Sequence, residues 1–258
     1  MIIDCNAFLG NWASRRLRHN DVPALLAMMD HFGIDRACVA SADAILYRDA
    51  HAGNEKIREE TRSHRNRFWC YATINPAYAG WQRDLRTCVD WGFKGMRLYP
   101  YYHHYALDGP EGAAVLDAAA EAGLPVSIPL RVVDARQRHW MDTATDLGLG
   151  AVVAAAEAHP KTRFLVSETV AGMAPSDGLW KRLRALPVYF EISRMTSVFG
   201  NSVGTLVRTL GTDRALLGTG FPFKTPSPAF LKVEILDEGD LVNRRILGEN
   251  AQKLFEAT

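Results

Sequence analysis

The chain has 258 residues, which suits one large α/β domain or two small ones, and its 48% hydrophobic content is enough to build a sizeable core. The formal net charge of +1 excludes a global basic field that would attract nucleic acid or a membrane surface. No signal-peptide pattern and no apolar run near ~18 residues is visible, and the four cysteines form no C-x-x-C pair, so we expect a cytoplasmic protein with reduced thiols.

Short apolar runs rich in strand-forming residues recur along the whole chain. Each run is almost continuously apolar rather than alternating, as expected for strands of a parallel sheet that is covered on both faces. Their spacing is close to the length of a βαβ unit. The predicted strands are residues 1–6, 36–41, 68–74, 93–99, 124–130, 163–168, 188–193 and 215–220.

Amphipathic stretches between these runs predict helices. The first follows Asp21 and Pro23, an N-cap and an early helical proline, and ends at Gly33, a natural left-handed C-terminal position. A second begins at Pro110 and closes on Gly123. The remaining predicted helices cover about residues 51–63, 79–91, 149–159, 178–186, 202–210 and 240–257.

Eight strand–helix units in one undivided length predict a single (β/α)8 TIM barrel over residues 1–258. No linker or low-complexity segment divides the chain. An open doubly wound sheet is the alternative, but no glycine-rich phosphate loop follows the first strand. Active sites of such barrels lie where the strands end, and polar or aromatic side chains stand at most of the predicted strand ends. The main ones are Asn6, Trp12, Asp43, Arg97, Tyr99, His103, Arg131, Glu168, Glu191, Ser193, Arg194 and Lys224.

Several segments resemble the amidohydrolase-related family, in order and across essentially the whole chain. IIDCNAFLG resembles the family's start, where I-I-D-x-H-x-H-x-G places two histidines on a metal. GFKGMRLYP, AGLPVSIPL and RFLVSETVAG resemble its fourth to sixth strands, LLGTGFPF the eighth and GENAQKLF the final helix. The resemblance implies the barrel fold and hydrolytic chemistry.

The departures from that pattern concern the metal ligands. Positions where the family carries histidines or an aspartate hold Asn6, Phe8, Pro129, Glu168 and Gly220. A catalytic Zn²⁺ needs about three His, Asp, Glu or Cys ligands. Asn6 and Glu168 retain oxygen atoms that suffice at most for a weak Mg²⁺ held with waters. We therefore expect no metal and no other cofactor.

Arginines at neighbouring strand ends favour a small anionic partner. Arg97, Arg131 and Arg136 follow the fourth and fifth strands, and the planar guanidinium suits carboxylate or phosphate. The alternative is that these arginines pair internally with acidic residues, of which Asp43, Asp134, Glu168 and Glu191 are the candidates.

The predicted catalytic residues are His103 and Glu168. His103 can act as a general acid or base, or simply pack among tyrosines. Glu168 is a general base or the partner of Arg131. The predicted substrate-binding residues, each with a packing or structural alternative, are Asn6, Trp12, Arg97, Tyr99, Arg131, Arg136 and His139. Cys5 is a weak nucleophile candidate because alternation turns it toward the helices if Asn6 faces inward.

Three functions remain open. The first is a metal-independent hydrolase of a small carboxylate-bearing lactone or amide, which has precedent among metal-free lactonases of related fold. The second is an inactive barrel that binds a small anion. The third, a lyase or decarboxylase, depends in the family on the missing metal. A homodimer is a generic expectation for such a barrel.

Overall fold

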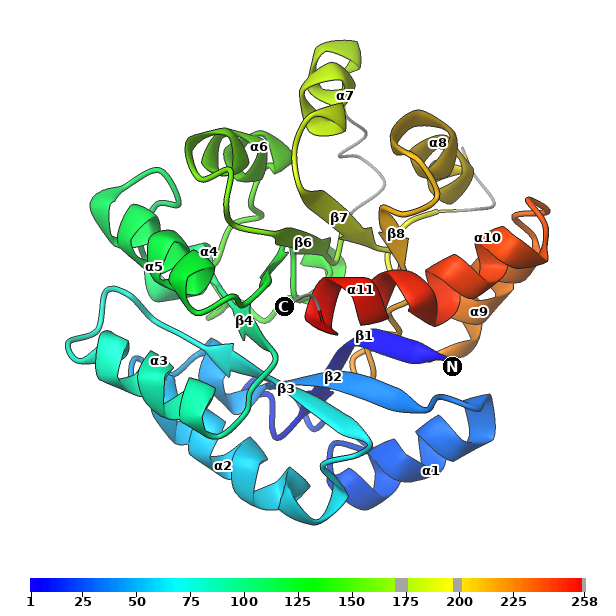
Figure 1. The fold of residues 1–258 in the computed structure, drawn as a ribbon. Coiled ribbons are helices and arrows are strands. Elements are labelled where there is room, and N and C mark those ends of the chain that lie inside the picture. The colour runs from blue at the N-terminus through cyan, green and yellow to red at the C-terminus, as the bar shows by residue number, and fades with distance from the viewer. Residues whose placement is uncertain (170–175, 197–200, 257–258) are drawn as a thin grey trace.

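Eight parallel strands pair in chain order in the computed structural model, which describes residues 1–169, 176–196 and 201–256. Because each strand is followed by helical segments on the outside, the arrangement is a (β/α)8 barrel (Figure 1). This confirms the predicted fold. The strands are β1 (Ile3–Leu9), β2 (Arg36–Ser41), β3 (Phe68–Thr73), β4 (Gly95–Arg97), β5 (Val126–Pro129), β6 (Phe164–Ser167), β7 (Val188–Glu191) and β8 (Ala215–Leu216).

The barrel is closed by backbone hydrogen bonds between β1 and the segment that begins at β8. Cys5 N donates to the Leu217 carbonyl at 2.9 Å, Gly220 N to the Asn6 carbonyl at 2.7 Å, and Phe8 N to the Phe221 carbonyl at 2.8 Å. These bonds satisfy the edges that an open sheet would leave unpaired.

Helices surround the barrel. Asp21 caps α1 as predicted, since its Oδ1 accepts from Ala24 N at 2.9 Å, and Gly33 follows with φ of 66°. The α-helices are α1 (Val22–Phe32), α2 (His51–Thr61), α3 (Trp81–Asp90), α4 (Pro100–His103), α5 (Pro110–Glu121), α6 (Leu149–Ala158), α7 (Asp177–Arg184), α8 (Ser202–Leu210), α9 (Ser227–Glu234), α10 (Asp240–Arg244) and α11 (Asn250–Glu256). Short 3₁₀ turns cover Asp43–Ile45, Arg62–His64 and Ala135–Gln137.

Three differences from the sequence prediction stand out. The short helices α4 and α9 were not predicted, because each is only one to two turns long and lies in a strand-to-helix connection. The predicted helix over 240–257 is interrupted by a π-helical turn, Arg245–Glu249, between α10 and α11. The first strand runs on to Leu9, three residues beyond its predicted end.

The core has two layers. Side chains on the outer face of the strands pack against the helices in one large cluster, and a second cluster fills the barrel interior. At the lower end of the barrel, α11 places Phe255 against Trp69 and Tyr71, with ring centroids 5.7 and 5.8 Å apart. Figure 1 shows α11 lying across this end. The opposite end, where the strands finish, is the mouth.

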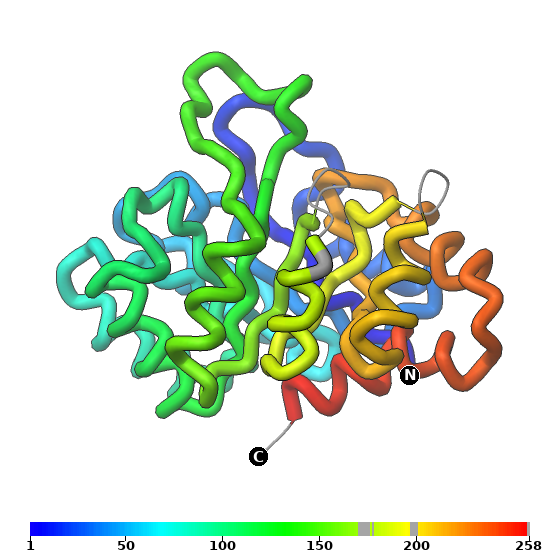
Figure 2. The backbone as a smooth tube through the Cα atoms, turned by 90° about the horizontal axis from the view of Figure 1, so that it is seen from above, coloured from blue at the N-terminus to red at the C-terminus, as the bar shows by residue number. Residues whose placement is uncertain are grey.

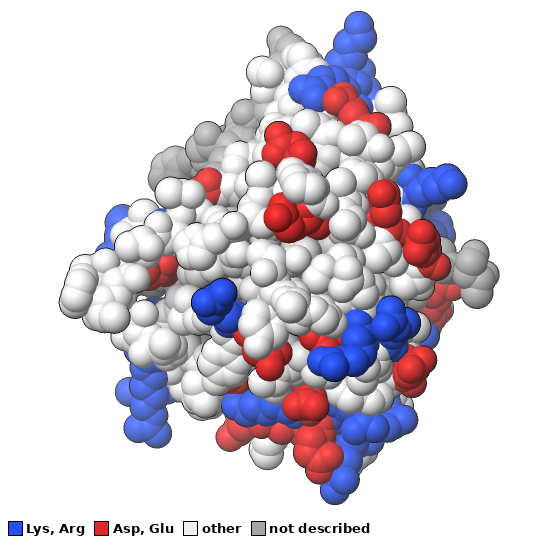
Figure 3. Space-filling view, turned by 90° about the vertical axis from the view of Figure 1, so that its left-hand side faces the viewer, with Lys and Arg blue, Asp and Glu red and all other residues white. Residues whose placement is uncertain are grey.

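Two segments stand up beside the mouth (Figure 2). The connection from Arg131 to Leu147 forms one, and the connection after β1 forms the other; Arg15 Nη1 donates to Gln137 Oε1 between them at 3.3 Å. We call residues 131–147 the arm. None of the described helices combines the length and apolar character needed to span a membrane. On the face shown in Figure 3, acidic and basic side chains are interspersed rather than gathered by sign.

Candidate active site

A bulge in β1 turns Asn6 into the barrel. Asp4 pairs with Ala37 and Ala7 with Val39, so three steps along β1 match two along β2. The Asp4 carboxylate supports this turn by accepting from Asn6 N at 3.0 Å and Thr219 N at 2.9 Å. The extra residue breaks strict alternation, and Cys5 also packs in the interior cluster. The expectation that Cys5 faces the helices is therefore wrong.

Arg97 forms the floor of the site. Its side chain is completely buried, and its guanidinium carbon lies 4.5 Å from the centre of the Tyr71 ring. Nη1 and Nη2 donate to Asn6 Oδ1 at 3.2 and 3.1 Å, and Nη1 also donates to Ser167 Oγ at 3.3 Å. Because the Asn6 oxygen accepts from Arg97, the Asn6 NH₂ group is directed toward the carboxylates above it.

Glu168 stands at the centre of the mouth. Its backbone has φ of 56°, a left-handed conformation that is uncommon for a side-chain-bearing residue. Oε1 accepts from Asn6 Nδ2 at 2.6 Å, and Oε2 accepts from both Arg194 Nε and Lys224 Nζ. Burial alone would raise the pKa of Glu168, but the charges of Lys224 and Arg194 outweigh it and lower that pKa to about 2. Glu168 is therefore a carboxylate at neutral pH.

A second carboxylate, Glu191, lies beside Glu168 and is completely buried. Its Oε2 accepts from Asn6 Nδ2 at 3.0 Å, Glu168 N at 3.2 Å and Ser193 Oγ at 3.0 Å. Burial, followed by the neighbouring charge of Glu168, raises the pKa of Glu191. The two carboxyl groups thus differ in basicity, as groups with different tasks do in many active sites.

Lys224 completes this mouth cluster, which consists of Asn6, Glu168, Glu191, Ser193, Arg194 and Lys224. Besides Glu168, its ammonium donates to Ser193 Oγ at 2.7 Å. A Cβ at Gly220 would lie 3.0 Å from Lys224 Nζ, so the absence of a side chain there gives the ammonium its place. Lys232 on α9 lies behind the cluster and donates to the Ile192 and Ser193 carbonyls at 3.0 and 2.6 Å.

The mouth cluster does not fit a metal ion. Within the described residues, no group of three or more His, Cys, Asp or Glu side chains is arranged to hold one. The Glu168 oxygens already accept from Asn6, Arg194 and Lys224, and a positive ammonium fills the space over Gly220. A divalent cation beside Lys224 would meet charge repulsion.

The structure brings only some of the predicted site residues together. Asn6, Arg97 and Glu168 are joined by hydrogen bonds. Arg131 pairs with Asp146 in the arm, as does Arg138. Of the two alternatives for Glu168, the pairing with Arg131 is therefore wrong. Arg136 pairs with Asp134 and is exposed, and His139 is exposed in the arm.

The described contacts do not connect His103 directly to the mouth cluster. It ends α4, is 6% exposed, and its Nε2 lies 3.2 Å from the Ala44 carbonyl. Burial lowers its pKa to about 4. Tyr99 packs beside it with ring centroids 6.0 Å apart, and Trp12 contacts Tyr102 edge-on at 6.0 Å. The catalytic or binding roles predicted for these residues stay predictions.

The sequence singled out Glu191, Ser193, Arg194 and Lys224 as strand-end side chains but not as site residues. Their common signal is position, since each follows or ends β7 or β8. Nothing in the spacing shows that Lys224, four residues beyond Gly220, folds back onto Glu168.

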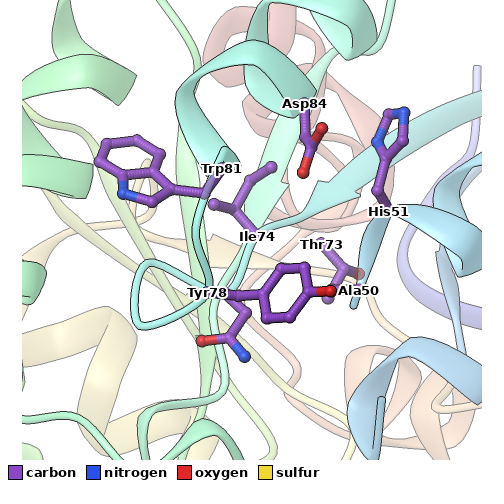
Figure 4. Close-up of a pocket in the computed structure, with 8 residues that line it drawn as sticks. Ala50, His51, Thr73, Ile74, Tyr78, Trp81 and Asp84 are labelled. Carbon is purple, nitrogen blue, oxygen red and sulfur yellow. The ribbon is translucent and has the colours of Figure 1, made fainter. Parts of the chain in front are cut away.

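A separate small cavity lies where β3 ends, between α2 and α3 (Figure 4). The space open to water-sized spheres is about 10 Å³, enough for about one water molecule. His51 Nδ1 and Thr73 Oγ1 face no hydrogen-bonding partner among the described residues, and both residues line this cavity. It is too small for a substrate.

Comparisons with known proteins agree with this architecture. The family model described as Amidohydrolase matches residues 5–257. No curated protein matches the chain. Similar solved structures include a 2,6-dihydroxybenzoate decarboxylase from Rhizobium, which has a TM-score of 0.76 and 16% identity, with 99% of this chain and 98% of that one covered.

Two further solved structures are similar over equally long spans. A dihydroxybenzoic acid decarboxylase from Polaromonas, with bound manganese and 2-nitroresorcinol, has a TM-score of 0.73 and 15% identity, covering 99% of this chain and 96% of that one. A 5-carboxyvanillate decarboxylase from Sphingomonas paucimobilis has a TM-score of 0.75 and 15% identity, covering 100% and 99%. At such identities the likeness concerns the fold.

Proposed function

Because this chain belongs to the amidohydrolase family, we propose that it binds a small carboxylate-bearing molecule at the barrel mouth and hydrolyses a lactone, ester or amide bond in it without a metal ion. The proposed carboxylate binding is supported by one observation, the surplus of positive charge at the mouth. The proposed hydrolysis is supported by the family and by the reactive side chains of the mouth cluster.

The charges at the mouth do not balance. Four cations, Arg97, Arg194, Lys224 and Lys232, lie in or next to the mouth cluster. The nearby carboxyl groups are Asp4, Glu168 and Glu191, and burial raises the pKa of Asp4 and of Glu191. Lys232 donates to backbone carbonyls only, within the described residues. A buried or half-buried surplus of cations is costly unless an anion compensates it. A carboxylate ligand supplies that compensation.

Arg194 is the residue best placed to hold such a ligand. Its Nε donates to Glu168 and its Nη2 to the Val132 carbonyl at 2.6 Å, while 15% of its side chain remains exposed. Nε and Nη2 of the guanidinium are thus held in place while part of the side chain stays exposed. Arginine in a fixed orientation is well suited to carboxylate recognition.

Aromatic rings near the mouth suit an aromatic or unsaturated acid. Trp12 contacts Tyr102 at 6.0 Å and Phe223 at 5.6 Å between ring centroids, and Phe223 contacts Phe8 at 5.1 Å. The Rhizobium and Polaromonas structures are decarboxylases of aromatic acids by name. An aromatic carboxylate is therefore the first ligand class to test.

Binding is tested by measuring the melting temperature with benzoate and phthalate, and with benzamide as an uncharged analogue. The carboxylates are expected to raise the melting temperature in proportion to the logarithm of their concentration, and benzamide is not. Arg194→Gln should abolish the shift, whereas Arg208→Gln, an exposed surface change on α8, should preserve it. A shift that is the same in Arg194→Gln would contradict the proposal.

Hydrolysis is tested by a screen of carboxylate-bearing lactones, esters and amides, with and without prolonged chelation. Turnover that survives chelation supports a metal-independent hydrolase. Turnover lost on chelation and restored by Mn²⁺ refutes metal independence. Carboxylate binding without any turnover favours the alternative, an inactive barrel that binds a small anion. Release of CO₂ from aromatic acids would instead indicate a decarboxylase.

A further inference from the structure

One hydroxyl group at the end of β7 lies between a carboxylate and an ammonium. Ser193 Oγ donates to Glu191 Oε2 at 3.0 Å and accepts from Lys224 Nζ at 2.7 Å. Ser193 is 9% exposed and 19% of the Lys224 side chain is exposed, whereas Glu191 is completely buried. Ser193 and Lys224 are therefore less deeply buried than Glu191.

The position of this serine is fixed by its neighbours. The Ser193 backbone N–H donates to Glu191 Oε1, and Glu191 Oε2 is held in turn by Asn6 Nδ2. Gly218 makes room for the carboxylate, because a Cβ there would overlap Glu191 Cγ, Cδ and Oε1. Arg97 orients Asn6 from below. Nucleophile, base and orienting group thus form one chain of contacts, which is the arrangement that activates serine in unrelated hydrolases.

We infer that Ser193 is the nucleophile of the proposed hydrolysis, that Glu191 is its base, and that the Lys224 ammonium stabilises the serine oxygen as its proton leaves. This inference rests on the proposed function and deepens it. Asn6 and Arg97 are positioning residues, and Arg194 holds the substrate carboxylate beside the serine.

The reaction proceeds in two balanced steps. Ser193 Oγ bonds to the carbonyl carbon while its proton moves to Glu191 Oε2 and the carbonyl electron pair moves to oxygen. Collapse of this intermediate breaks the C–O or C–N bond, and the leaving group takes the proton from Glu191, which leaves an acyl-serine. Water then attacks the acyl carbon, gives a proton to Glu191, and releases the acid as Ser193 recovers its proton.

A covalent probe tests this without knowledge of the substrate. 4-Carboxybenzenesulfonyl fluoride carries a carboxylate for Arg194 and an electrophilic sulfur for the serine. Attack forms the S–O bond, breaks the S–F bond, releases fluoride and passes the serine proton to Glu191. Intact-mass measurement should show one adduct, and peptide mapping should place it on Ser193.

Matched variants make the result specific. Ser193→Ala should abolish labelling, and Ser63→Ala, a change of an exposed serine, should leave it unchanged. Glu191→Gln keeps the shape but removes the base, so labelling should slow by about 100-fold. If Glu191→Gln unfolds, the comparison of labelling in wild type and in Ser193→Ala tests the inference by itself. The uncharged phenylmethanesulfonyl fluoride should label more slowly than the carboxylate-bearing probe.

Two outcomes would overturn the inference: no adduct, or an adduct on another residue that persists in Ser193→Ala. If either occurs while benzoate still raises the melting temperature, carboxylate binding stands and only the serine role fails. If benzoate has no effect in wild type, the proposed binding function fails independently of the labelling result.

Discussion

Gly218 lies directly against the side chain of Glu191, and a Cβ at this position would overlap three atoms of that side chain. Gly218→Ala should therefore displace Glu191 from Asn6 and Ser193. Overpacking of this kind costs about 1–3 kcal/mol. Urea unfolding should show a loss in that range. Gly148→Ala is the matched control, since no atom lies within 4 Å of its added methyl group. Equal stability of the two variants would contradict the described packing.

Glu168→Gln should strengthen anion binding. In the wild-type chain the Glu168 carboxylate accepts from Arg194 and Lys224, so it competes with any bound anion for the same two cations. Glutamine retains a carbonyl oxygen but no charge. We expect benzoate to bind about tenfold more tightly, a gain of about 1.4 kcal/mol, in isothermal titration calorimetry. Loss of benzoate binding in this variant would show that Glu168 itself is required to hold the ligand.

Arg97→Met should be strongly destabilising. The change removes a buried charge and the two hydrogen bonds that Arg97 donates to Asn6 Oδ1. Breaking a buried charged network by removing one partner costs about 3–5 kcal/mol. Arg136→Met provides the comparison, because that side chain is 88% exposed, and its cost should be near zero. Similar unfolding midpoints for the two variants would disprove the placement of Arg97.

His103 predicts a pH dependence of stability. Its pKa is lowered to about 4 by burial, whereas an unfolded histidine titrates near ~6.5. Between these values the unfolded chain binds the extra proton, so stability is full above pH ~6.5 and falls as the pH decreases toward 4. The loss at pH 4 is roughly 3 kcal/mol. His103→Gln should flatten this part of the stability profile measured by urea unfolding. An unchanged slope of stability against pH in His103→Gln would contradict this role of His103.

The strands and longer helices could be predicted because their signals are local. The run at 36–41 and the helix at 202–210 match β2 and α8 residue for residue. The course of β1 could not be predicted from local signals. Its bulge depends on pairing with β2 and on the contact between Asp4 and Thr219, which lies near the other end of the chain. The π-helical turn before α11 likewise contacts a distant strand end, since Leu217 N donates to the Ile246 carbonyl at 2.8 Å.

The same distinction applies to the site. Asn6, Arg97 and Glu168 could be identified as candidates because each stands at or near the end of a predicted strand. The choice of partners could not be predicted, because Arg131 follows β5, Arg194 follows β7, and both of these strands lie next to β6, which precedes Glu168. Asp146, fifteen residues beyond Arg131 in the arm, accepts a hydrogen bond from that arginine. Arg194 pairs with Glu168 instead. This choice of partners depends on how the loops fold.

The closure of the lower barrel end by Phe255 has a kinetic consequence. With that end filled by rings from Trp69, Tyr71 and Phe255, the barrel is a cup rather than a tube. Whatever enters over the rim must leave over it, and the product of the proposed hydrolysis keeps the carboxylate that Arg194 attracts. Product and substrate therefore occupy the same place in turn, and the product should act as a competitive inhibitor.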